Sequence, residues 1–158
     1  MNKDTRYSRF EDVTGLYGRL RKEDVEELEA AGTYPFKALH DGYLLSKPCL
    51  TVIDPKTGVP SVMLGIVKQD GPLDLIWLLG TDAIETNAIP FAKQSKPILE
   101  YLFKETGSNG FYNYSWIGNQ LHHKWLKWLG FKAIRKVNMG PHGEEFYEFV
   151  KLRSNSGT

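Results

Sequence analysis

The sequence contains almost no cysteine and almost no net charge, and each shortage excludes a class of protein. Cys49 is the single cysteine among 158 residues, so an internal disulfide or a cysteine-based metal site is ruled out. Twenty Lys or Arg residues are balanced by 19 Asp or Glu residues, which leaves a net charge of +1. This balance argues against a nucleic-acid-binding protein held mainly by bulk positive charge. Because the chain can form neither a disulfide nor a cysteine-based metal site, its stability must come from a hydrophobic core.

Long hydrophobic runs are also missing. No uncharged apolar stretch approaches the roughly 20 residues needed to cross a bilayer. The first residues, Met1 to Asp4, are polar and provide no hydrophobic core for a signal peptide. We expect a cytoplasmic protein without a membrane partner.

Aromatic residues are plentiful, and the apolar spacing and turn residues around them predict an alternation of elements. Ser8 and Glu11 stand at capping-box spacing ahead of a first helix that ends near residue 20. Val25 and Leu28 predict the inner face of a second helix, with its acids elsewhere, and Pro35 begins a third. The elements expected are a strand at 5–8, helices at about 9–20, 22–31 and from 35, strands at 49–53, 59–67 and 73–79, a helix after 89, a strand at 111–117, a helix at about 120–129 and strands at 131–138 and 145–152.

This order predicts an α+β fold, with a mixed central sheet of about six or seven strands flanked by helices. Residues 1–152 form the expected single domain and residues 153–158 a disordered tail. Pro97 lies inside the helix expected after residue 89, so that helix either starts late with Ser95 as its cap or bends in its first turns.

The helix near residue 120 has the clearest pattern. Asn119 stands at its expected cap, and Gly130 ends it. At 100° per residue, His122 falls on the apolar arc and His123 on the polar side. Trp125 and Trp128 fall at core positions.

The element order and this helix resemble the GCN5-related N-acetyltransferase (GNAT) family. In that family an Asn after the fifth strand is followed by a helix that ends in Gly-Phe, and Asn119, Gly130 and Phe131 match this spacing. More narrowly, the chain resembles small podovirus proteins with a GNAT-like fold, labelled acetyltransferase or internal virion protein. The GNAT resemblance also includes residues 6–12 and 20–24. The narrower resemblance is clearest at 20–24, 77–81 and 119–131.

The resemblance implies acetyl-CoA as a cofactor and an amine as the acceptor. In GNAT enzymes the backbone of the fourth strand and a glycine-rich loop hold the cofactor. The matching residues here are Trp77, Leu78, Leu79, Gly80 and Thr81, together with Asn119 after the fifth strand.

Two positions depart from the family pattern. The loop at 80–89 has one glycine and two acidic residues, and the negative charge of these residues would repel a diphosphate. Leu126 stands where many GNAT enzymes carry a tyrosine that protonates the leaving thiolate, and leucine has no proton to donate.

His122 is therefore the candidate general acid or base, because the pKa of histidine lies near neutrality. The alternative is a hydrogen-bonded histidine at the edge of the core. Asn119 likewise either contacts a ligand or only caps its helix. His122 and His123 are adjacent and point apart, which excludes a shared metal ion.

Two functions stay open from sequence. The first is acyl transfer from acetyl-CoA to an amine. The second is a non-catalytic phage accessory or virion-assembly protein that binds phage or host proteins, located in the host cytoplasm or packaged in the virion. A surplus of basic residues after residue 111 suits an acidic partner or the phosphates of coenzyme A, or is only the solvated face of a helix. The acceptor and the oligomeric state are not encoded in any motif.

Overall fold

The computed structural model describes residues 2–154, and these form one seven-stranded mixed sheet with helices on both faces. The spatial order is β1-β2-β3-β4-β5-β7-β6. The strands are β1 (Thr5–Tyr7), β2 (Cys49–Ile53), β3 (Pro60–Val67), β4 (Asp74–Gly80), β5 (Gly110–Trp116), β6 (Lys132–Met139) and β7 (Glu144–Leu152). The expected α+β class is confirmed.

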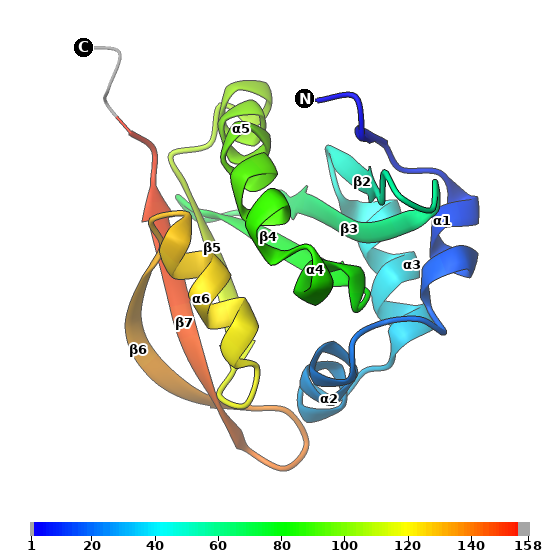
Figure 1. Cartoon of the computed structure of the whole chain (residues 1–158). Coiled ribbons are helices and arrows are strands. Elements are labelled where there is room, and N and C mark those ends of the chain that lie inside the picture. The colour runs from blue at the N-terminus through cyan, green and yellow to red at the C-terminus, as the bar shows by residue number, and fades with distance from the viewer. Residues whose placement is uncertain (1, 155–158) are drawn as a thin grey trace.

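Six helices connect or precede these strands in the described part of the chain (Figure 1). They are α1 (Phe10–Leu16), α2 (Lys22–Ala30), α3 (Pro35–Leu45), α4 (Ala83–Thr86), α5 (Ala88–Thr106) and α6 (Gln120–Trp128). None of the helices within residues 2–154 is long and apolar enough to span a membrane.

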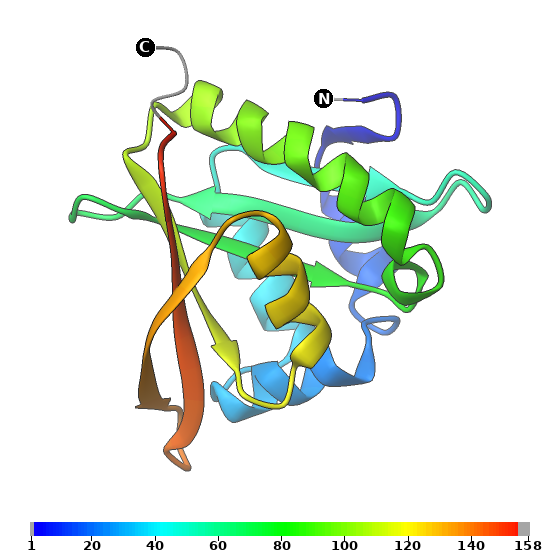
Figure 2. The same ribbon diagram turned by 60° about the vertical axis from the view of Figure 1, so that its left-hand side comes forward.

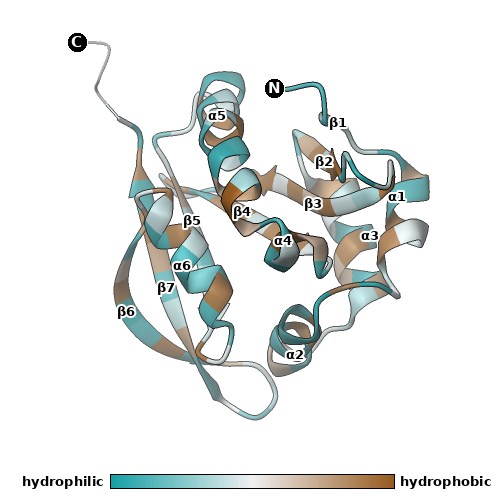
Figure 3. Cartoon of the chain, viewed as in Figure 1, coloured by the Kyte–Doolittle hydropathy of each residue, from teal (hydrophilic) through white to brown (hydrophobic). Residues whose placement is uncertain are grey.

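The sheet separates two hydrophobic clusters. One face of β2, β3 and β4 packs against α5 and α6 through side chains such as Leu64, Ile98 and Leu126. The other face packs against α1 and α3 through Leu16, Leu39 and other residues. Because both faces are covered, the central strands are almost continuously apolar, as the brown ribbon of β3 shows in Figure 3. The edge strand β6 is mostly exposed and carries basic residues, which discourages edge-to-edge pairing.

The feature that positions the site is the divergence of β4 and β5 (Figure 2). These two strands run parallel and pair at Asp74 with Phe111 and at Leu75 with Tyr112. Beyond this point β4 continues along β3 and β5 continues along β7. The result is a V-shaped opening in the middle of the sheet, and α2 contacts β5 at its open end.

The structure corrects several N-terminal predictions. The capping box uses Arg9 and Asp12 rather than Ser8 and Glu11, because the Asp12 carboxylate accepts a hydrogen bond from the Arg9 N–H at 2.8 Å. The first helix ends at Leu16 and not near residue 20. On α2, the acidic residues Asp24 and Glu27 are buried while Val25 and Leu28 are only half-buried, so the buried face is not the apolar one.

The C-terminal half follows the predicted elements closely. The helix α5 runs through Pro97 without starting at Ser95, whose hydroxyl donates to the Ala92 carbonyl at 2.6 Å. Arg153, assigned to the expected tail, donates to the carbonyls of Ser108 and Phe103. Residues 155–158 of that tail lie outside the described residues.

The loop between β6 and β7 closes against the end of α2. Gly140 has a φ of +78°, and a Cβ atom there would lie 1.8 Å from the Ala30 carbonyl oxygen. Only glycine permits both this backbone conformation and this approach. The contact holds the hairpin beside the open end of the V, where Met139 becomes part of a cavity wall.

Candidate functional site

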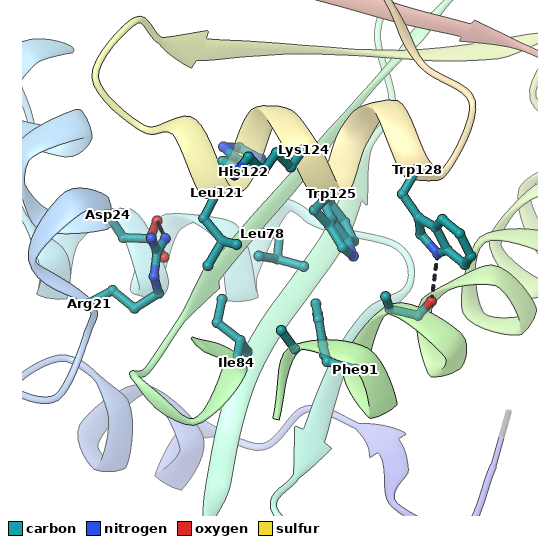
Figure 4. Close-up of a pocket in the computed structure, with 12 residues that line it drawn as sticks. Arg21, Asp24, Leu78, Ile84, Phe91, Leu121, His122, Lys124, Trp125 and Trp128 are labelled. Carbon is teal, nitrogen blue, oxygen red and sulfur yellow. Dashed lines mark hydrogen bonds and ion pairs between the residues drawn. The ribbon is translucent and has the colours of Figure 1, made fainter. Parts of the chain in front are cut away.

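Two cavities flank the opening between β4 and β5. The first, here the α5–α6 cavity, has a volume of about 230 Å³ and lies between these two helices (Figure 4). Its walls are mostly apolar and include Leu78, Ile84, Phe91, Leu121, Trp125 and Trp128. The Trp128 indole N–H donates to the Ala92 carbonyl at 2.9 Å and so links α6 to α5 at one end of the cavity.

The second, here the α2–α3 cavity, has a volume of about 310 Å³. It is lined by residues of α2, α3, β4, the middle of β5 and the β6–β7 hairpin. Apolar and aromatic side chains again predominate, among them Leu28, Leu45, Trp77, Tyr114, Met139 and Phe146. Its polar lining residues include Glu27, Asp41 and Asn113.

Leu78 and His122 line both cavities, so the two spaces meet at these residues. The Thr81 N–H donates to the Ser61 carbonyl, so the odd-numbered residues of this strand turn their backbone groups toward β3 in the antiparallel ladder. Even-numbered residues of β4 therefore turn their backbone groups toward β5. The Ile76 carbonyl accepts from Asn113 and the Gly80 N–H donates to Asp24, while the backbone groups of Leu78 between them face the opening.

His122 is 6% exposed and is oriented by two partners. Its Nδ1 lies 3.0 Å from the Ser115 hydroxyl oxygen and 3.5 Å from Oε2 of Glu27. Burial lowers the pKa of His122, but the facing Glu27 carboxylate outweighs burial and holds this pKa above the ordinary histidine value. Since Nδ1 is engaged by these partners, Nε2 is the ring nitrogen left to meet a ligand.

Glu27 is itself fully engaged. Its Oε1 accepts hydrogen bonds from the Trp116 N–H at 2.6 Å and from the Ser115 hydroxyl at 3.0 Å. Burial raises the pKa of Glu27, but His122 and these donors reverse that effect, and the pKa is lowered overall. Glu27 is therefore an ionised partner that fixes the imidazole and favours its charged form.

A second buried network closes the open end of the V. Arg21 is 2% exposed, and its guanidinium donates to Oδ1 of Asp24 at 2.8 Å and to Oε1 of Glu85 at 3.0 Å. Asp24 also accepts from the Gly80 N–H at 2.9 Å and from the Asn119 amide at 2.9 Å. Burial raises the pKa of Asp24 even though Arg21 opposes the change. This network connects α2, the end of β4 and the start of α6.

The structure separates the strand residues that the sequence analysis grouped as a cofactor site. Leu78 is the one that faces the α5–α6 cavity, and Trp77 and Leu79 line the α2–α3 cavity. The Trp77 indole N–H donates to the Ser46 hydroxyl at 2.6 Å. The N–H groups of Gly80 and Thr81 are taken by Asp24 and Ser61.

Asn119 precedes α6 as expected, but its side chain does not cap the helix. The residue is fully buried, its amide donates to Asp24, and its Oδ1 lies 3.3 Å from the Arg21 guanidinium that donates to it. In this structure Asn119 holds the buried network together. The acidic loop joins this network, because Glu85 forms an ion pair with Arg21, a guanidinium that it shares with Asp24 and Glu23.

Two orientation predictions on α6 are wrong. His123 is buried rather than on a polar side, and its Nε2 lies 3.0 Å from the Trp116 carbonyl oxygen. Trp128 is 48% exposed and is not a core residue. The reason is that α6 lies beside the V-shaped opening, where β5 and β7 cover a second side of the helix. A helical pattern with one apolar face predicts that this side is exposed to solvent.

Sequence reasoning missed five residues of the site: Arg21, Asp24, Glu27, Asn113 and Ser115. The one sequence feature that could have indicated them is the three-residue spacing of Asp24 and Glu27, which places both carboxylates on one helix face. Cys49 is buried, and burial raises the pKa of its thiol, which disfavours a nucleophilic role. Within residues 2–154 no cluster of three or more His, Cys, Asp or Glu side chains is arranged to hold a metal ion.

The chain is similar in structure to known acetyltransferases, although neither a family model nor a curated protein matches its sequence. A GNAT-family acetyltransferase from Bacillus anthracis superposes with a TM-score of 0.72 at 12% identity, covering 96% of each chain. The aminoglycoside acetyltransferase AAC(6')-Ib, in complex with ribostamycin and coenzyme A, gives 0.70 at 16% identity over 94% of this chain and 92% of its own.

Another similar structure is the ribosomal-protein-S5-alanine acetyltransferase from Vibrio fischeri. It gives a TM-score of 0.70 at 12% identity over 98% of this chain and 96% of its own. Because these likenesses cover nearly the whole chain, including the opening between β4 and β5, the chain has the fold of the GNAT acyl-CoA N-acyltransferases.

Proposed function

We propose that this protein is an acyl-CoA-dependent N-acyltransferase that transfers an acetyl group to an amine. The observation that carries the proposal is the meeting of two cavities at the β4–β5 opening, with His122 in the wall of both. Such an arrangement brings two reactants together from opposite sides, and the transfer then benefits from proximity. The shared GNAT fold supports the class of reaction and does not identify the acceptor.

The α5–α6 cavity fits the thioester arm of acetyl-CoA. Its walls are apolar, and the Trp125 indole N–H is buried without a hydrogen-bond partner, so it is a donor ready for an amide carbonyl. Leu78, Phe91 and Trp125 would hold the arm. Lys124 lines the cavity, and the Lys96 ammonium lies 4.0 Å above the Trp128 ring, so these lysines would meet the phosphates in place of a glycine-rich loop.

Bound acetyl-CoA would supply an acyl group activated as a thioester. The chain would supply proton transfer through His122, because Nδ1 is fixed by Ser115 and Glu27 and Nε2 is free to act. Nε2 of His122 would take the proton that the amine loses as its nitrogen bonds to the acyl carbon and the carbon–sulfur bond of the thioester breaks. The same nitrogen can return a proton to the sulfur, since the imidazole borders both cavities.

A cavity-filling variant tests the assigned cofactor cavity. Ala88 is exposed and lines the α5–α6 cavity, so Ala88→Trp is expected to fill the cavity without disturbing the core. Isothermal titration calorimetry should show acetyl-CoA binding to the wild type and at least about tenfold weaker binding to this variant. The matched control is Ile89→Trp, at a position that is 70% exposed on the same helix. Absence of binding at millimolar acetyl-CoA, or equal weakening by both variants, would contradict the proposal.

The pH dependence gives a second test. The pKa of His122 is raised by Glu27, so the neutral base forms at a higher pH than in an ordinary histidine, and kcat/KM should rise through that raised pKa. Glu27→Gln removes the charge that raises this pKa, and the acidic limb of the pH profile should move to lower pH. Steady-state kinetics across the pH range measure this shift. A limb that stays in place would show that His122 does not control the rate.

A non-catalytic, protein-binding role is the second candidate. It is favoured by the loop before α5, which has acidic Asp82 and Glu85 where a diphosphate would bind. Arg21 pairs with Glu85 and so offsets part of this negative charge, which weakens this objection to catalysis. Failure to bind acetyl-CoA in the titration above would favour the protein-binding role.

A further inference from the structure

Asn113, a residue in the wall of the α2–α3 cavity, carries a buried polar atom that has no hydrogen-bond partner. Asn113 is 7% exposed on β5, and its Oδ1 is buried without a hydrogen-bond partner. Its Nδ2 donates to the Ile76 carbonyl at 2.6 Å across the opening. Because that carbonyl can only accept, the amide orientation is determined, and Oδ1 must be the atom that points away from β4. A buried acceptor of this kind requires a donor.

The carboxylates of the same cavity are already engaged. Glu27 accepts from Ser115 and the Trp116 N–H and faces His122. Asp41 accepts from Lys37 at 2.6 Å. No further Asp or Glu lines this cavity among the residues the structure describes. A ligand with one N–H-bearing group finds a partner in Asn113 Oδ1. A second buried cation would find no free carboxylate in the buried part of the wall, because Asp41 is 46% exposed at the surface.

The remaining wall selects the body of the ligand. Leu28, Ala38, Leu45, Val67, Leu75, Trp77, Met139 and Phe146 give it an apolar and aromatic surface. A volume of about 310 Å³ suits a small molecule or one apolar side chain. An extended polycation would lose hydration here without gaining compensating contacts.

We propose that the acceptor is a primary monoamine with an apolar or aromatic body, and that Asn113 positions its nitrogen through Oδ1. This inference rests on the proposed function, since it assigns the α2–α3 cavity to the acceptor of that reaction. It differs from the function of the aminoglycoside acetyltransferase among the similar structures, because aminoglycosides are polycations. Asn113 is a positioning residue, and His122 remains the residue that moves the proton.

Binding of the amine can be measured without acetyl-CoA. Calorimetry with 2-phenylethylamine should show binding to the wild type at least about tenfold tighter than binding of spermidine. Asn113→Ala should weaken 2-phenylethylamine binding at least about tenfold, with a KM effect larger than its kcat effect in turnover and with unchanged acetyl-CoA binding. Equal affinity for the two amines in the wild type, or an unchanged affinity in the variant, would overturn the inference.

A second variant, designed to gain binding, tests the inference even where Asn113→Ala fails to fold. Leu45 lines the mouth of the cavity and is 63% exposed, so Leu45→Asp can add a free carboxylate without burying it. Spermidine binding should rise by at least about fivefold relative to 2-phenylethylamine. An unchanged ratio would count against this cavity as the acceptor site. Acetyl-CoA binding together with a preference for spermidine in the wild type would overturn this inference alone, whereas absence of acetyl-CoA binding would remove the proposed function as well.

Discussion

Replacing His122 by alanine is expected to reduce kcat by about 10²–10⁴, the usual contribution of a positioned acid or base. The reason is that His122 borders both cavities and has one nitrogen free of its orienting partners. The affinity for acetyl-CoA should change by no more than about threefold, because the apolar cavity wall is retained. Steady-state kinetics and calorimetry measure the two effects separately.

His122→Asn controls for structural damage. The asparagine amide can still donate toward Glu27, so this variant should melt closer to the wild type than His122→Ala does, while it loses turnover to the same degree. His142→Ala, at an exposed position in the β6–β7 loop, should leave both properties unchanged. Turnover within about threefold of wild type in His122→Ala would return this histidine to a structural role.

Replacing Asp24 by alanine is expected to cost about 3–5 kcal/mol of unfolding free energy, the typical penalty for breaking a buried ion pair. The substitution leaves the Arg21 guanidinium with Glu23 and Glu85 as its only carboxylate partners among the described residues, and both are more exposed than Asp24. It also removes the acceptor for the Gly80 N–H and the Asn119 amide. Urea denaturation at neutral pH measures the loss.

Glu23→Ala is the matched control on the same helix. Its carboxylate lies 3.4 Å from the same guanidinium but is 40% exposed, so the expected cost is below about 1 kcal/mol. A loss below about 1 kcal/mol for Asp24→Ala would show that Glu85 and solvent replace Asp24 as the partner of Arg21. The buried network would then not be what holds α2 at the open end of the V.

Local sequence signals predicted most of the elements because each signal acts within a few residues. The strand expected at 49–53 coincides with β2, and the helix expected after Asn119 coincides with α6 and ends before Gly130, whose φ is +93°. The errors fall where tertiary contacts override local polarity. Asp24, Glu27 and His123 are polar residues that the fold buries, and a hydrophobic pattern assigns such residues to the surface.

The sequence by itself determined the α+β class, the succession of strands and helices along the chain, and His122 as a candidate general acid or base. Only the tertiary structure decided which groups surround that histidine. Ser115 and Glu27 are separated by 88 residues and Asn119 and Asp24 by 95, yet each pair is hydrogen-bonded. The physical reason is that β4 and β5 pair over two positions and then diverge, which opens the sheet and lets α2 insert its acids. No local periodicity encodes that divergence, because it depends on how distant strands pair.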